Sequence, residues 1–134
     1  DNYWQTCSGL GLLLQEWGFA EHFPAVVVLP QLPRKPWGVQ WWQGWAEPQI
    51  QDVVMAQLWQ TVRRYRCDAR RIYLVGESLG GEGVWHLGRR FPSVFAGIAA
   101  VCGSLDPYDW DNWVWGEDKD AYKNVAEEAA APIW

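Results

Sequence analysis

Residues 71–81 read Arg-Ile-Tyr-Leu-Val-Gly-Glu-Ser-Leu-Gly-Gly. The apolar run over residues 71–75 is typical of a strand buried in a parallel sheet, and we expect Gly76 to end it. The residues that follow predict a helix over 80–91, because Pro92 forces the residue before it out of the helical conformation. This stretch therefore predicts a strand, a sharp turn and a helix in immediate succession.

The flanking sequence continues the alternation of strands and helices. Outward from residues 71–81 we expect helices over 10–17, 48–65 and 120–130, strands over 25–29 and 96–102, and the first residues of a further strand at 131–134. Single apolar runs between helices predict a parallel α/β sheet with right-handed crossovers. Ligands of such sheets bind beyond the carboxyl ends of the strands. The loops after Leu29, Val75 and Cys102 therefore share the edge where chemistry is expected.

The turn after the second strand carries a recognisable motif. Residues 76–80 match the G-x-S-x-G pattern of a nucleophile elbow, in the strand-to-helix context that this motif requires. We interpret Ser78 as a nucleophile in a strained backbone conformation, with glycine at 76 and 80 to avoid a collision across the turn. Gly81 would let the helix pack closely. The backbone N–H of Leu79 would face a developing oxyanion. The alternative is a Gly-rich turn that binds a phosphate or has no ligand.

The sequence offers no obvious base for Ser78. His86 begins about 12 Å along the helix axis from the serine, at 1.5 Å per residue, which exceeds the reach of a general base. His22 precedes the first expected strand and so belongs to the opposite edge of the sheet. Asp106 follows the third strand on the active edge and is the one candidate acid, although a turn residue beside Pro107 is the simpler interpretation.

Tryptophan is abundant, with 12 residues in the chain. Seven of them fall in the two loops that flank Ser78: Trp37, Trp41, Trp42, Trp45, Trp110, Trp113 and Trp115. Such rings could stack on a sugar or an aromatic acyl group, or simply cover the ends of the sheet. We expect Trp17, Trp59 and Trp85, on helices, to lie in the core.

Composition narrows the function classes. The chain has 134 residues, of which 49% are hydrophobic and 20% charged, as expected for one packed domain. Its net charge of −5 gives no basic surface for nucleic acid, and small neutral or cationic substrates fit better. No apolar run approaches the roughly 18 residues of a membrane span.

No metal site or cofactor is expected, since Cys7, Cys67 and Cys102 do not cluster with histidine. Buried reduced cysteine is the simpler interpretation, with one disulfide left open. Compartment and oligomeric state also stay open. Because the chain starts at Asp1 without an initiator Met, we expect it to be cut from a longer protein.

The motif and its surroundings resemble a known family. Residues 71–81, preceded by Tyr65-Arg66-Cys67-Asp68 and followed by Trp85, Arg90-Phe91-Pro92 and Phe95-Ala96, are similar to the polyhydroxybutyrate-depolymerase and feruloyl-esterase branch of the α/β hydrolases. The resemblance also includes residues 25–31 and covers most of residues 23–134. It implies a partial α/β-hydrolase fold over residues 1–134, a single domain.

The resemblance also implies parts that the chain lacks. Family members carry a His-Gly oxyanion-loop motif upstream, an Asp after the next strand and a His after the one beyond. Glu77 and Leu79 stand where this branch often has Leu or His and Met, so the pocket could be reshaped.

The leading hypothesis is a serine hydrolase of carboxylic esters, free or carbohydrate-linked, that acts through Ser78 and an acyl-enzyme. The isolated chain is expected to be inactive because His and Asp are missing. The alternatives are a peptidase of the prolyl-oligopeptidase type and a non-catalytic carbohydrate-binding or scaffold remnant.

Overall fold

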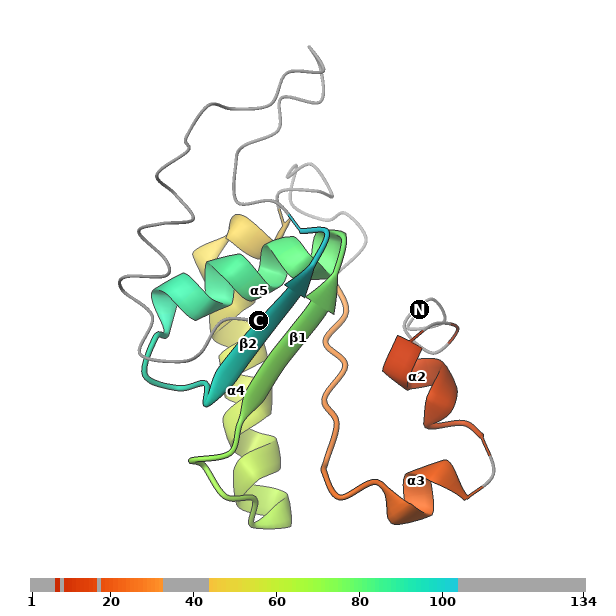
Figure 1. Ribbon diagram of the computed structural model, residues 1–134. Helices are drawn as coiled ribbons and strands as arrows, with labels where there is room; N and C mark the ends of the chain where they lie inside the picture. Colours follow the sequence, from red (N-terminus) through yellow and green to blue (C-terminus); the bar gives the residue numbers. More distant parts are fainter. Residues whose placement is uncertain (1–6, 8, 17, 33–43, 104–134) are drawn as a thin grey trace.

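A two-stranded parallel sheet forms the centre of the molecule. The computed structural model describes residues 7, 9–16, 18–32 and 44–103. Strand β1 (Tyr73–Glu77) pairs with β2 (Gly97–Val101), in a register that runs from Tyr73 opposite Gly97 to Glu77 opposite Val101. Helix α5 (Leu79–Arg90) forms the crossover between the strands, and α4 (Pro48–Tyr65) precedes them (Figure 1). The arrangement is a partial α/β fold, as the sequence predicts.

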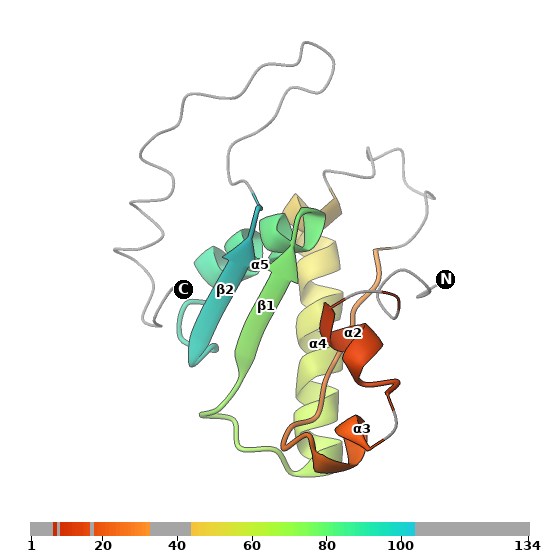
Figure 2. The ribbon, with the colours of Figure 1, turned by 45° about the vertical axis from the view of Figure 1, so that its right-hand side comes forward.

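Both long helices cover the same face of the sheet. A core cluster joins α4, α5, β2 and the residues that lead into the strands: Met55, Ile72, Val84, Leu87, Phe95 and Ile98. On the opposite face, Tyr73, Val75 and Val101 are 66%, 69% and 52% exposed. Figure 2 shows α4 and α5 behind the two strands, on one side of the sheet.

Local signals explain the bounds of α4. Pro48 lies at the first turn, where a missing N–H costs no helical hydrogen bond. The helix ends at Arg66, which adopts a left-handed φ of 52° and donates its N–H to the carbonyl of Val62. The predicted helix over 48–65 is confirmed.

Short helices precede α4. They are α2 (Gly9–Leu13), α3 (Phe19–His22) and the 3-10 turn η1 (Gly44–Ala46). The helix expected over 10–17 is present but shorter: α2 ends at Leu13, residues 14–16 form a turn, and Gly18, with a φ of 82°, precedes α3. A residue with positive φ cannot continue a helix.

Other element predictions need correction. The strand expected over 25–29 is wrong: this segment runs beside the sheet without a ladder partner among the described residues (Figure 1). An apolar run favours a strand, but a strand forms only where a neighbouring backbone supplies hydrogen-bond partners.

The bounds of the two observed strands differ slightly from those expected. β1 starts two residues later than expected and passes through Gly76, which pairs with Ala100. The third strand expected over 96–102 is confirmed within one residue at each end. The elements expected over 120–130 and 131–134 lie outside the described residues.

The cysteines also differ from expectation. All three are free thiols, but Cys7 and Cys102 are exposed and Cys67 is half-buried.

No helix in the described ranges is long and apolar enough to cross a membrane. Within the same ranges, no group of three or more His, Cys, Asp or Glu side chains could hold a metal ion.

Candidate active site

The turn between β1 and α5 places Ser78 in a rare backbone conformation. Its φ is 54° and its ψ is −118°, outside the regions that non-glycine residues ordinarily adopt. The residue is exposed at the carboxyl end of β1, and its carbonyl accepts the N–H of Glu82 at 3.1 Å. The chain thus changes from strand to helix within one residue, and it leaves the Ser78 side chain at the sheet edge.

Gly76 makes this sharp turn sterically possible. A Cβ atom at position 76 would collide with the backbone of Gly80. A Cβ at Gly80 would meet no described atom within 4 Å, so the expected need for glycine there is wrong. The steric constraint acts in one direction only, because the Cβ of residue 76 would point across the turn and that of residue 80 would point away from it.

Val101, the last residue of β2, and the two residues that follow it, Cys102 and Gly103, form what we call the β2 exit, and they lie against the turn. The N–H of Ser78 donates to the carbonyl of Val101 at 2.8 Å. A Cβ at Gly81 would lie 2.8 Å from the Cα of Gly103, so the backbones of α5 and of the β2 exit are in direct contact. The prediction that Gly81 permits close packing is confirmed.

Trp85 adds a second connection to the β2 exit. Its indole Nε1–H donates to the carbonyl of Gly103 at 3.2 Å, across 18 residues of sequence. The half-buried ring is packed against the core cluster, as expected, but its N–H binds the backbone at the edge of the sheet. Sequence reasoning missed Trp85 and Gly103 as site residues; a glycine just after a predicted strand was the one available signal.

Leu79 is the first residue of α5. Its backbone N–H has no carbonyl one turn earlier within the helix, so it belongs to the unpaired amides of a helix N-terminus. That end of the helix also carries partial positive charge from the aligned peptide dipoles. The neighbourhood of Ser78 is therefore electrostatically favourable for a developing negative charge.

Two titratable groups on α5 have shifted pKa values. Burial raises the pKa of Glu82 above its ordinary 4.5. Burial, and to a smaller extent the charge of Arg89, lowers the pKa of His86 below 6.5. Glu82 lies one helical turn after Ser78 and His86 two turns after it.

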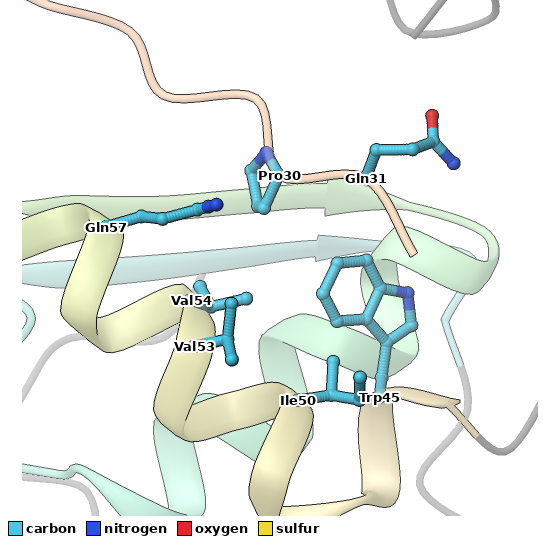
Figure 3. Close-up of a pocket in the computed structure, with 7 residues that line it drawn as sticks. All are labelled: Pro30, Gln31, Trp45, Ile50, Val53, Val54 and Gln57. Atoms are coloured by element: carbon cyan, nitrogen blue, oxygen red, sulfur yellow. The ribbon is translucent and has the colours of Figure 1, made fainter. Parts of the chain in front are cut away.

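Trp45 is the one described member of the seven loop tryptophans. It is 8% exposed, and its ring lies against Gly83 of α5, where a Cβ would come within 3.0 Å. The ring also lines a pocket of about 300 Å³ between residues 30–31 and the first half of α4 (Figure 3). The lining is mainly apolar and uncharged: Pro30, Gln31, Trp45, Ile50, Val53, Val54 and Gln57.

The structure brings part of the predicted site together. Ser78, Leu79 and the glycines 76, 80 and 81 form one turn, and Trp45, in η1, packs its ring against Gly83 of α5. The other predicted residues lie outside the described part of the chain: Asp106, Trp37, Trp41, Trp42, Trp110, Trp113 and Trp115.

The comparisons with known proteins agree with this geometry. Residues 20–132 match the family described as "Putative esterase". The match spans most of the chain and includes the whole turn, the sheet and both long helices, so the protein belongs to this esterase family, a class of hydrolases. Comparison with curated proteins and with solved structures gives no match.

Proposed function

We propose that this esterase is a serine hydrolase of carboxylic esters in which Ser78 is the nucleophile. The observation that carries the proposal is the strained backbone of Ser78 at the carboxyl end of β1 and the start of α5. Strain of this kind costs on the order of 1–3 kcal/mol, persists only where the surrounding structure enforces it, and clusters at active sites.

The proposed reaction follows from that position. The Ser78 oxygen attacks the ester carbonyl carbon, and the N–H of Leu79 donates to the oxyanion of the tetrahedral intermediate. The intermediate collapses to an acyl-enzyme as the alcohol leaves with a proton. Water then attacks the acyl carbon, which releases the acid and restores the serine hydroxyl.

A general base must remove the serine proton, and neither described histidine fits this role. His86 lies two turns along α5 from Ser78, and His22 belongs to α3. The resemblance assigns the base to a His and the acid to an Asp, each after a later strand of the sheet, with Asp106 as the local candidate for the acid. The isolated chain should therefore hydrolyse p-nitrophenyl acetate poorly or not at all.

Covalent labelling tests the nucleophile. A fluorophosphonate should label the natural full-length protein at Ser78, and Ser78→Ala should abolish both labelling and ester hydrolysis. Ser93→Ala, at an exposed turn residue, is the matched control and should label like the unaltered protein. Labelling that persists in Ser78→Ala would refute the assignment.

The proposal also includes a substrate class. The loop tryptophans and the uncharged pocket beside Trp45 favour an ester with an aromatic or sugar group, as in the feruloyl-esterase branch. A prolyl-oligopeptidase-type peptidase would instead cleave proline-containing peptides faster than matched esters. Sugar binding without any labelling of Ser78 would favour the carbohydrate-binding or scaffold alternative.

A further inference from the structure

We propose that Trp85 is a positioning residue for Ser78 and acts through the β2 exit. The inference rests on the proposed function, since it assigns Trp85 a part in presenting the nucleophile. It starts from one hydrogen bond, from the Trp85 indole N–H to the Gly103 carbonyl at 3.2 Å.

The two segments touch at three points. Ser78 donates its N–H to the Val101 carbonyl, Gly81 contacts Gly103 backbone to backbone, and Trp85 donates to Gly103. The three residues on the helix side lie at the start of α5 and one and two turns along it, whereas their partners lie within the three residues Val101 to Gly103. The β2 exit is therefore fixed against the first two turns of α5.

The backbone of the β2 exit requires such fixation. Cys102 is not glycine and has a φ of 45°, a conformation of elevated energy. Two positive-φ residues, Ser78 and Cys102, thus lie on adjoining segments joined by the hydrogen bond from Ser78 to Val101. Relaxation of Cys102 would displace the Val101 carbonyl and with it the backbone of Ser78.

Trp85 opposes this relaxation from the far side of Cys102. Its ring is packed against the core, so the indole N–H has a fixed position. The Gly103 carbonyl is held by that N–H, and Cys102 is confined between two hydrogen-bonded carbonyls, those of Val101 and Gly103. Loss of the indole N–H frees one end of this short segment.

The test measures how fast Ser78 reacts and how tightly the probe binds beforehand. Trp85→Phe removes the N–H and keeps an aromatic ring. The limiting rate of phosphonylation by a fluorophosphonate should fall about tenfold, less than the hundredfold that a displacement of 1 Å can cost. The fluorophosphonate concentration that gives half of this limiting rate should change less than twofold, because the surface that binds the probe is unaltered.

Trp59→Phe is the matched control. Trp59 is a half-buried tryptophan of α4, packed against the same core cluster. The Trp59→Phe substitution should lower the free energy of unfolding without lowering the limiting rate of phosphonylation. Equal rates for Trp85→Phe and the unaltered protein, or an equal fall in both variants, would overturn the proposal.

Amide hydrogen exchange supplies a readout that does not depend on activity. The Ser78 N–H should exchange at least tenfold faster in Trp85→Phe than in Trp59→Phe. Gly103→Ala, whose Cβ would collide with the backbone of Gly81, should give the same signature. If the unaltered full-length protein does not label, the serine-hydrolase function fails; the exchange rates then still decide whether Trp85 positions Ser78.

Discussion

At the scale of single residues, the site depends on an asymmetry between two glycines of one motif. Gly76 and Gly80 occupy equivalent places in the G-x-S-x-G pattern, yet only position 76 lacks room for a Cβ atom. The motif alone cannot show this, because it states identities and not directions. The structure therefore separates a glycine required by packing from one that packing permits to change.

This asymmetry predicts opposite effects for two alanine substitutions. Gly76→Ala should lower the free energy of unfolding by about 3 kcal/mol, since backbone atoms of Gly80 must move. Gly80→Ala lies within α5 and should raise it by up to about 1 kcal/mol, because alanine favours helix. Urea denaturation of both variants checks this. Similar losses in the two would contradict the one-directional constraint.

His86 should make stability depend on pH. Its pKa is lowered in the folded state by burial and by Arg89, so the unfolded chain binds the proton more readily. Stability from this group is present above pH 6.5 and is lost as pH falls below that value. His86→Gln should lose less stability than the unaltered protein between pH 7.5 and pH 5. The measurement is the free energy of unfolding of both proteins, from denaturation at several pH values. If the two free energies change with pH in parallel, His86 makes no such contribution.

At the scale of elements, the end of α5 is joined to the start of α4 by one side chain. Arg90 donates to the Pro48 carbonyl at 2.7 Å and to Oε1 of Gln51 at 3.2 Å, and it pairs with Asp52 at 2.8 Å. Gln51, 4% exposed, in turn donates to the Trp45 carbonyl at 2.8 Å. The guanidinium thus connects both helices to η1.

Arg90→Lys should lower the free energy of unfolding by about 1.5 kcal/mol, because a single ammonium cannot reproduce the planar set of donors and Gln51 loses a partner. Asp52→Asn, at a side chain that is 62% exposed, should cost less than about 0.5 kcal/mol. Thermal unfolding of both variants provides the measurement. A larger loss for Asp52→Asn would indicate that the ion pair, and not the carbonyl contacts, joins the helices.

Local signals explain which elements could be predicted from the sequence. Pro48, the apolar spacing of α4 and Pro92 after α5 act on their own neighbourhoods, and these helices were predicted within about one residue. Residues 25–29 carry an equally apolar run, but strand pairing depends on distant backbone. The same distinction holds at the site: the turn at Ser78 is a local motif, whereas the bond from Trp85 to Gly103 spans 18 residues.

At the scale of the whole molecule, the sheet has one packed face and one exposed face. Val84, 1% exposed, lies in the core between α5 and the sheet, while Val75, 69% exposed, projects from the other face of β1. Tyr73 and Val101 share that exposed face, as the alternation of side chains and the register of the two strands require. Apolar side chains there contribute little by burial within the described part of the chain.

The two faces should therefore respond differently to the same substitution. Val84→Ala removes buried methyl groups and leaves a cavity, so it should lower the free energy of unfolding by about 2 kcal/mol. Val75→Ala removes methyl groups that already contact solvent and should change it by less than about 0.5 kcal/mol. Urea denaturation with a shared m-value decides the comparison. An equal loss at Val75 would mean that the exposed face is packed in solution, so the core would extend through both sides of the sheet.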